Sequence, residues 1–309
     1  MTEDQEWDLV IIGGGPAGMT AAIYGARYGL KTLLLESAVL GGAQATSPGI
    51  ENYPGFTFIS GMDLADRMKE QVKKAGATIK EIAEVSSVKK SKKGFDVETR
   101  RGTFHAKAIV FATGGGHRKL KVPGEEEFTG RGVSYCATCD GPLFRGKTVA
   151  VVGGGNTAVT EALYLAELTG KTYLIHRRNE LRAEKALQNQ IFESSVEILW
   201  DTIVKEIRGD QVVKSLLLEN VKTKEQRKLE VDGVFIALGV EPLSQLAKDL
   251  GVETNDYGEI KVDKLQRTNI PGVYAAGDVT DTMKQIVVAA AGGAIAADSA
   301  YKFIRQQEK

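Results

Sequence analysis

The sequence predicts an α/β protein made of two similar three-layer domains, the second of which is inserted into the first. Two observations lead to this prediction. One β-α-β pattern occurs twice along the chain, and each copy is followed later by a further buried apolar strand. The chain has 309 residues, which is enough for two domains that each bury a core.

The two copies of the pattern cover residues 9–36 and 149–176. Each contains a short apolar strand, a glycine turn, a helix with small residues on one side, and a second apolar strand. The first turn glycine and the residue that closes the second strand are 23 positions apart in both copies. This pattern is typical of a Rossmann-like nucleotide-binding domain.

Small residues mark both turns in the order that a bound diphosphate requires. They are Gly13, Gly15 and Gly18 in the first copy and Gly153, Gly155 and Ala158 in the second. The first position makes the tight turn, the second lets backbone approach a pyrophosphate, and the third lets the helix pack closely on the strand. The free N–H groups of the helix then face the diphosphate. One such string is weak evidence, but two in full β-α-β context predict two dinucleotide sites.

The residues that close the second strands predict different nucleotides. Glu36 can accept hydrogen bonds from ribose hydroxyls and would repel a 2'-phosphate. The second copy has His176 here, followed by the arginines Arg177, Arg178 and Arg182. Taken alone, these arginines are more simply a solvated helix start. Because they follow a glycine turn at the expected distance, they predict NADPH in the second domain, which leaves FAD for the first.

The domain boundaries follow from the order of these segments. We expect an FAD-binding domain in two parts, residues 1–117 and 246–309, around an NADPH-binding domain at residues 118–245. Glycine, proline and polar residues near 116–121 and 242–247 indicate the two connections between the domains.

The remaining segments complete the two halves. The first half continues with a helix at 61–75, a meander of short strands at 78–104 and an apolar strand within 108–115. Short strands at 198–218 and a similar apolar strand within 232–242 complete the second half. A buried strand ending in Asp278 and a long alanine-rich helix then return the chain to the first domain.

Both cysteines of the chain, Cys136 and Cys139, lie in the string SYCATCDGPLF, directly before Asp140. In a reducing cytosol a single C-x-x-C is more often redox-active or metal-binding than a structural crosslink. Two chains could share a zinc ion through such pairs, but the duplicated glycine turns would then have no explanation. From the sequence alone, Asp140 is equally well a general acid/base or a turn former.

Composition and charge exclude several function classes. Lysine plus arginine and aspartate plus glutamate both number 40, so no nucleic acid or acidic membrane surface is expected as a partner. The acidic N-terminus shows no export signal, and the weakly polar run at 286–297 is too short to span a bilayer. We therefore expect a cytoplasmic location. The three histidines are far apart in the chain, and we expect no metal site.

These motifs occur in the order found in one enzyme family. The first glycine turn with Glu36, then ATGG, SYCATCDGPLF, GGGNTA with HRRNELRAEK, and GVYAAGD resemble the low-molecular-weight, bacterial and archaeal type of thioredoxin reductase, a class of pyridine nucleotide-disulfide oxidoreductase. The likeness runs from Asp8 to the C-terminal helix. The CATCD string inside the inserted domain is its most specific part.

The resemblance implies a role for each matching position. The implied FAD-binding residues are Gly13, Gly15, Pro16, Ala17, Gly18, Glu36, Gly42, Gln44, Asn52, Thr113, Gly114, Gly277, Asp278, Gln285, Ile286 and Val287. The implied NADPH-binding residues are Gly153, Gly155, Asn156, Thr157, Ala158, His176, Arg177, Arg178 and Arg182. Among the catalytic residues, Cys139 would be the thiol nearest the flavin, Cys136 would attack the partner disulfide, and Asp140 would be the acid/base.

The activity implied is that of an NADPH-dependent thioredoxin-disulfide reductase, a homodimer whose partner is thioredoxin or a thioredoxin- or glutaredoxin-like protein. Hydride would pass from NADPH to FAD and then to the Cys136–Cys139 disulfide, which would exchange with the partner. A dithiol oxidase or a ferredoxin-linked disulfide reductase of the same fold would keep FAD and the C-x-x-C. Neither would need the arginine cluster.

Four positions depart from the usual pattern of this family. Ala43 stands where a glutamine commonly follows the glycine pair, and Gln44 comes one position later. Asn156 and Thr157 replace the usual aspartate and serine after the second glycine triplet, and Lys284 replaces the arginine before the last helix.

Overall fold

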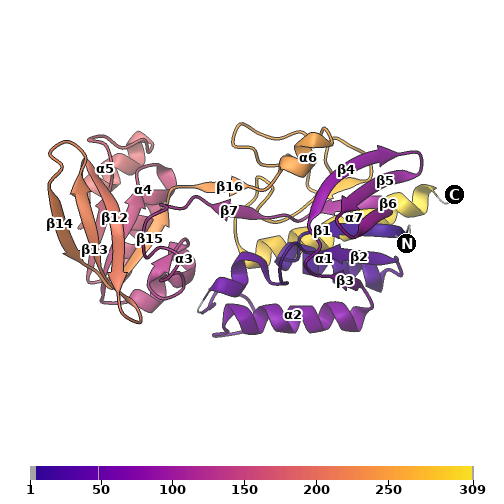
Figure 1. Ribbon diagram of the computed structural model, residues 1–309, viewed down its shortest axis with the longest axis horizontal. Coiled ribbons are helices and arrows are strands. Elements are labelled where there is room, and N and C mark those ends of the chain that lie inside the picture. Colours follow the sequence, from indigo (N-terminus) through magenta and orange to yellow (C-terminus); the bar gives the residue numbers. More distant parts are fainter. Residues whose placement is uncertain (1–4, 48, 308–309) are drawn as a thin grey trace. The chain divides into compact units, whose positions relative to one another are not determined.

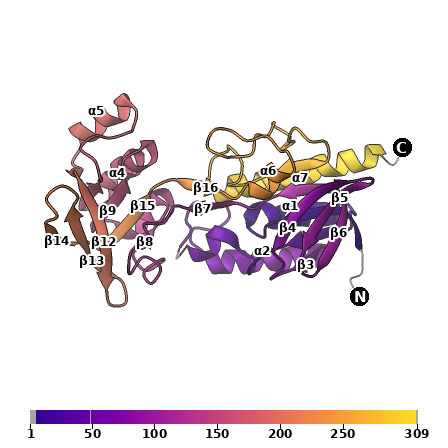
Figure 2. The same cartoon turned by 45° about the horizontal axis from the view of Figure 1, so that its top comes forward.

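The protein forms two compact units in the computed structural model, which describes residues 5–47 and 49–307 (Figure 1, Figure 2). Unit 1 comprises the chain up to Thr46, Tyr53–Gly116, and the chain from Glu241 onward. Unit 2 comprises Ser47–Asn52 and His117–Val240. Between the units the chain runs through β7 (Gly115–His117) and β16 (Val240–Pro242), which pair with each other.

The sheet of unit 1 has the strand order β3-β2-β1-β6-β5-β4, and β17 also pairs with β6. Its strands are β1 (Gln5–Ile12), β2 (Thr32–Leu35), β3 (Thr78–Lys80), β4 (Val85–Ser91), β5 (Gly94–Thr99), β6 (Gly102–Phe111) and β17 (Val273–Ala275). The pairs among β3, β2, β1, β6 and β17 are parallel, whereas β4, β5 and β6 pair antiparallel. The long strand β6 therefore belongs to both arrangements.

The predicted meander at 78–104 is wrong for its first strand. β3 pairs in parallel with β2, with Leu33 opposite Thr78, and only β4, β5 and β6 form a meander. The reason lies in the connection, because α2 (Gly61–Ala75) provides the long crossover that two parallel strands require. Ser60 caps this helix by accepting a hydrogen bond from the Asp63 N–H, and Gly76 ends it in a left-handed conformation.

Two helices of unit 1 pack directly on each other. They are α1 (Pro16–Arg27) and α7 (Ile286–Gln307). A Cβ atom built on Gly293 would lie 2.1 Å from the backbone oxygen of Ala17, so the two helices approach to backbone contact. Close approach of this kind requires a residue without a side chain.

Helix α7, which begins with the apolar run noted in the sequence, is 22 residues long. By length and composition, this helix is apolar enough to cross a membrane. Its small residues, among them Gly292, Gly293, Ala296 and Ala297, are buried within the described part of unit 1. A core helix of a globular domain has the same composition.

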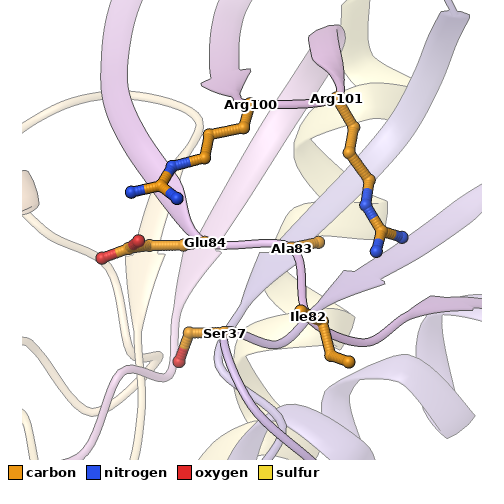
Figure 3. A pocket seen from close by; sticks show the side chains of 6 residues that line it. All are labelled: Ser37, Ile82, Ala83, Glu84, Arg100 and Arg101. Carbon is orange, nitrogen blue, oxygen red and sulfur yellow. The ribbon is translucent and has the colours of Figure 1, made fainter.

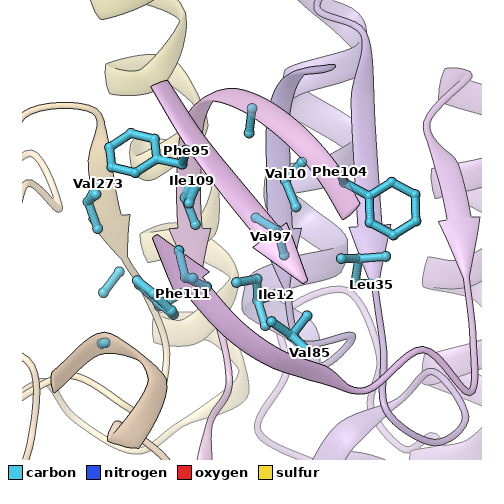
Figure 4. Close-up of a cluster of buried hydrophobic side chains, with 14 of the residues drawn as sticks. Val10, Ile12, Leu35, Val85, Phe95, Val97, Phe104, Ile109, Phe111 and Val273 are labelled. Carbon is cyan, nitrogen blue, oxygen red and sulfur yellow. The ribbon is translucent and has the colours of Figure 1, made fainter. Parts of the chain in front are cut away.

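The other face of this sheet carries a cluster of buried hydrophobic side chains (Figure 4). Val10 and Ile12 of β1 pack there with Phe95 and Val97 of β5, and each of the four side chains is at most 4% exposed. The short helix α6 (Gln245–Asp249) contributes Ala247 to the same cluster. Burial of these side chains fixes the end of β1, from which the first nucleotide turn extends.

Unit 2 repeats the three-layer arrangement. Its parallel sheet has the order β11-β10-β9-β15-β8, formed by β8 (Val133–Ser134), β9 (Thr148–Gly153), β10 (Lys171–Ile175), β11 (Glu197–Leu199) and β15 (Gly233–Ala237). A layer of antiparallel strands consists of β12 (Thr202–Gly209), β13 (Val213–Asn220) and β14 (Gln226–Glu230). The helical layer consists of α3 (Ala137–Asp140), η2 (Gly141–Phe144), α4 (Asn156–Leu168) and α5 (Lys185–Glu193).

Two buried clusters hold the layers of unit 2 together. One joins the sheet to β12 and β13 through side chains such as Val152, Val204 and Leu216. The other joins the sheet to α4 through side chains such as Val151 and Leu165. The predicted α/β class, with one three-layer nucleotide-binding domain inserted into another, is therefore confirmed.

The two adjacent glycines of α7 provide a test of the α1–α7 contact. Gly293→Ala should lower the midpoint of thermal unfolding, with a loss of about 1–3 kcal/mol, because the new Cβ overlaps the Ala17 carbonyl. Gly292→Ala is the matched control, since its Cβ would meet only side-chain atoms, the nearest being the movable Gln266 Oε1 at 3.3 Å and the Ala276 Cβ at 3.4 Å. Equal midpoints for both variants, measured by circular dichroism, would contradict the proposed backbone contact.

Candidate functional site

The first glycine turn joins β1 to α1 and has no room for side chains at two of its positions. The Gly13 N–H donates to the Leu35 carbonyl at 2.8 Å, and a Cβ on Gly13 would lie 2.3 Å from the Ala112 oxygen. A Cβ on Gly18 would lie 1.8 Å from the Gly13 oxygen. Strand and helix are therefore in backbone contact, as the motif predicts.

Gly15 differs, because the protein itself leaves space around it. The nearest atom to a Cβ on Gly15 would be the Gly42 Cα, at an ordinary contact distance of 3.8 Å. Gly15 is also the N-cap of α1 and offers the helix no capping side chain, and Pro16 begins the helix. An open glycine followed by uncapped helical N–H groups fits a diphosphate ligand.

Glu36 lies at the end of β2 and is held against this turn by backbone donors. Its Oε2 accepts from the Gly14 N–H at 2.6 Å, and its Oε1 accepts from the Ala38 N–H at 2.8 Å and from the Ser37 hydroxyl at 3.0 Å. The carboxylate is thus fixed in orientation. Carboxylate oxygens have further acceptor capacity, so Glu36 can still accept from a ribose hydroxyl.

A pocket that the sequence did not predict adjoins Glu36 (Figure 3). It is lined by Ser37, Ile82, Ala83, Glu84, Arg100 and Arg101. The Ala83 N–H donates to the Glu36 carbonyl at 2.8 Å, which ties the pocket to the end of β2. No motif marks residues 82–84 in the sequence; the parallel pairing of β3 with β2 brings them here.

Other predicted FAD-binding residues of unit 1 follow β6 and β17. Thr113 and Gly114 come after β6, and the Thr113 hydroxyl donates to the Leu243 carbonyl at 2.6 Å. Gly277 and Asp278 come after β17, which pairs in parallel with β6. Burial raises the pKa of Asp278. The two pairs therefore lie at the carboxyl ends of neighbouring parallel strands, where α/β sheets bind ligands.

The start of α7 adds the last predicted group of unit 1. Gln285 directly precedes the helix, and Ile286 and Val287 are its first two residues. Lys284, which stands before them, forms an ion pair with Glu259 at 2.8 Å. Its charge is thereby matched within unit 1.

Gln44 is buried in the 3-10 helix η1 (Gly42–Thr46) and has one polar atom without a partner. Its Nε2 contacts the Met68 sulfur at 3.6 Å, while its Oε1 has no hydrogen-bond partner among the described residues. Buried acceptors are normally satisfied, so this oxygen fits a ligand donor. Asn52, also predicted for FAD, belongs instead to the segment Ser47–Asn52 that packs with unit 2.

The second glycine turn shows the same contrast between closed and open positions. A Cβ on Gly153 would lie 2.5 Å from both the Ala158 Cβ and the Ala237 oxygen. A Cβ on Gly155 would meet no atom within 4 Å. Gly155 therefore has space for a ligand next to the start of α4, where Asn156 and Thr157 are the first residues.

His176 lies beneath this turn and is buried. Its ring occupies the space next to Gly154, where a Cβ would approach the ring to 2.2 Å. The imidazole Nε2 is 3.0 Å from the Glu180 carbonyl, and the ring meets Trp200 edge-on. Burial lowers the pKa of His176, so the ring is neutral at neutral pH. It supports the turn from within unit 2.

The arginines that follow His176 are exposed, and one of them is hydrogen-bonded to the turn through its backbone. Arg177, Arg178 and Arg182 are all exposed. The Arg182 N–H donates to the Gly154 carbonyl at 2.7 Å. Asn156 strengthens the same connection, because its side chain donates to Glu184 Oε1 at 2.9 Å and accepts from the Glu184 N–H at 2.8 Å. The backbone of Arg182 is thus held at the turn, next to the open Gly155.

The two cysteines of unit 2 form a disulfide. Cys136 is the N-cap of α3, Cys139 lies within it, and their Cα atoms are 5.3 Å apart. The shared-zinc alternative would need both sulfurs unbonded. The disulfide therefore favours redox chemistry for this pair.

Asp140 is buried next to the disulfide and is bonded to two serines. Its Oδ2 accepts from the Ser134 hydroxyl at 2.7 Å, and its Oδ1 accepts from the Ser47 hydroxyl at 3.2 Å. Ser134 also accepts from the Cys136 N–H at 3.1 Å. Burial raises the pKa of Asp140, against the opposing effect of the serine hydrogen bonds. Neither serine was predicted, because no spacing in the sequence links them to the aspartate.

Comparison with known proteins agrees with this arrangement. A family model of pyridine nucleotide-disulphide oxidoreductases matches residues 7–293. A thioredoxin reductase from Listeria monocytogenes is 43% identical over 309 residues, covering 99% of this chain and 96% of its own length. One from Bacillus subtilis is 41% identical over 317 residues, covering 100% of this chain and 98% of its own.

Solved structures show the same relationship. The crystal structure of thioredoxin reductase from Streptococcus pyogenes has a TM-score of 0.93 and 42% identity, covering 98% of this chain and 100% of its own. Thioredoxin reductase from Giardia duodenalis has a TM-score of 0.91 and 35% identity, covering 98% of this chain and 100% of its own. The chain therefore belongs to the pyridine nucleotide-disulphide oxidoreductases and, within them, to the low-molecular-weight thioredoxin reductases.

Proposed function

We propose that this chain is an NADPH-dependent thioredoxin-disulfide reductase that contains FAD. The observation that carries the proposal is the Cys136–Cys139 disulfide inside an inserted nucleotide-binding unit. Full-length similarity to thioredoxin reductases supports it. We also propose a cytoplasmic homodimer that acts on thioredoxin or on a thioredoxin- or glutaredoxin-like protein.

In this proposal unit 1 holds FAD. The diphosphate would lie at Gly15 and the start of α1, with the ribose at Glu36. The pocket beside Glu36 would receive the adenine end, and the unpartnered Oε1 of Gln44 would accept a hydrogen bond from the flavin. When bound, FAD carries two electrons from the nicotinamide to the disulfide.

Unit 2 would hold NADPH at Gly155 and the start of α4. Arg177, Arg178 and Arg182 would bind the 2'-phosphate, because guanidinium groups match phosphate in charge and geometry. His176 would act indirectly, by filling the space beneath Gly154. The open Gly155, the exposed arginines and the backbone contact between Arg182 and Gly154 support this assignment.

The reduced cysteines would then act on the partner protein. Cys136, as thiolate, would attack the partner disulfide and release one partner sulfur as a leaving thiolate, which takes a proton from Asp140. Cys139 would next attack Cys136, which restores the disulfide and releases the second partner sulfur. Asp140 suits proton transfer because burial raises its pKa, so the carboxyl group keeps its proton to higher pH than an ordinary aspartate does.

The proposed function is tested by mixing the purified flavoprotein with NADPH without oxygen and then adding oxidised thioredoxin. The flavin absorbance should bleach rapidly, and thioredoxin should be reduced. Cys139→Ser should still bleach with NADPH but should reduce no thioredoxin, since the internal disulfide is lost. A flavin that stays oxidised with NADPH would contradict the proposal, as would thioredoxin reduction by the Cys139→Ser variant.

The arginine cluster should decide the choice between NADPH and NADH. We expect Arg177→Ala combined with Arg178→Ala to raise the KM for NADPH roughly 10- to 100-fold, the loss expected for charge-assisted hydrogen bonds. The KM for NADH should change little. Arg227→Ala on β14, also exposed and in unit 2, is the control for loss of positive charge. An equal change for both nucleotides would exclude 2'-phosphate binding by these arginines.

Substitutions of Asp140 and Ser134 should change the pH profile of thioredoxin reduction in different ways. Asp140→Asn keeps a hydrogen-bonding group but cannot transfer a proton, so thioredoxin reduction should fall by roughly 10²- to 10⁴-fold. Ser134→Ala removes a bond that lowers the pKa of Asp140, so the alkaline limb of the rate profile, where Asp140 loses the proton that it donates, should move to higher pH. An unmoved limb in Ser134→Ala would mean that Asp140 is not the titrating group.

A further inference from the structure

A second carboxyl group lies next to the short helix that carries the C-x-x-C, and the proposed function does not use it. Glu161 is on α4, and its carboxylate forms a hydrogen bond with the backbone of Ala137, the residue that follows Cys136. The packing between these segments is tight, since a Cβ on Gly141 would lie 3.0 Å from Leu165 and 3.1 Å from Tyr164. The distance between Glu161 and the C-x-x-C helix is therefore fixed.

The hydrogen bonding of this carboxyl is incomplete. Glu161 Oε2 is buried and has no hydrogen-bond partner among residues 5–47 and 49–307. A buried oxygen without a partner disfavours the ionised form of a carboxyl group. A buried carboxyl group with an unsatisfied oxygen lowers the stability of the fold, and a purely structural role would not compensate for that loss.

No other charge compensates Glu161. The titratable groups on α4 and on the elements packed against it are Tyr164 and the exposed Glu167 on α4, Asp140 on α3, Lys171 and Tyr173 on β10, and Lys185 and Glu193 on α5. Strands β9 and β15 and the 3-10 helix η2 carry no titratable side chain. Burial raises the pKa of Glu161 to about 7, the Ala137 hydrogen bond opposes the shift, and none of those groups contributes.

We propose that Glu161 is a positioning residue that sets the thiol pKa of the reduced Cys136–Cys139 pair and holds the second proton of its reduction. The inference rests on the proposed function only for the source of the electrons. Reduction breaks the S–S bond with two electrons from the nicotinamide. One proton goes to a thiol, and the other resides either on the second sulfur or on the Glu161 carboxyl, which leaves that sulfur as the attacking thiolate.

The sign of the effect follows from charge. An ionised Glu161 repels a nearby thiolate and raises the thiol pKa, so the last proton is shared between the two groups. Removing the carboxylate removes the repulsion. The thiolate should then form at lower pH, with no second acceptor for the proton.

The test measures thiol reactivity and needs neither NADPH nor thioredoxin. The full-length flavoprotein is reduced with dithiothreitol, separated from it without oxygen, and alkylated with iodoacetamide at a series of pH values. Mass spectrometry reports the rate directly, because the chain has only two cysteines. Glu161→Gln should shift the rate profile to lower pH by about one unit, the usual size of a like-charge effect. Glu167→Gln, an exposed glutamate on the same helix, should match the unchanged protein.

The outcomes are separable. A Glu161→Gln profile that overlays the Glu167→Gln profile, in protein with a native circular dichroism spectrum, would overturn the inference. If Glu161→Gln does not fold, Glu161→Asp replaces it; this variant keeps the charge but withdraws it by one methylene, so a smaller shift is expected, and an unshifted profile overturns the inference. If Glu161→Gln shifts the alkylation profile but the unchanged protein cannot oxidise NADPH, the proposed function is overturned and the inference about Glu161 stands.

Discussion

The absence of space for a side chain where strand meets helix is the constraint on which both units depend. In unit 1 the Gly13 carbonyl occupies the position of a Cβ on Gly18. In unit 2 the same requirement falls on Gly153, because Ala158 already brings a Cβ into the contact. In both units the start of the helix therefore packs directly against the end of the strand. The helical N–H groups then point into space that the backbone leaves open, next to Gly15 and Gly155.

The two turns share this contact but are supported differently. In unit 1 a carboxylate, Glu36, accepts the Gly14 N–H and still faces outward. In unit 2 an imidazole, His176, fills the equivalent space beside Gly154 and is buried. The same spacing of 23 positions therefore places an outward-facing carboxylate in one unit and a buried supporting ring in the other. Spacing alone identifies the position and leaves its role open.

Sequence reasoning reached the features that local patterns determine. The repeat, the order of motifs and the C-x-x-C follow from spacing, and the structure and the comparisons bear out the α/β class and the family. What the sequence left out depends on segments that meet only after folding. Ser134 reaches Asp140 through the end of β8, and Ala83 reaches Glu36 through the β2–β3 pairing. The environment of Glu161 likewise depends on how α3 lies on α4. Short strands such as β3 carry too little pattern to reveal their partner.

The insertion of unit 2 has a consequence for synthesis on the ribosome. Almost all of unit 2 is one continuous stretch, His117–Val240, so its sheet and helices can form as soon as that stretch has emerged. Unit 1 must wait, because β17 and α7 complete its sheet and cover α1, and they come last in the chain. Until α7 has emerged, α1 packs on α2, and the side of α1 that α7 covers has no partner helix. Synthesis of unit 1 thus begins before that of unit 2 but is completed after it. During that interval unit 1 is the part of the nascent chain that most needs a chaperone.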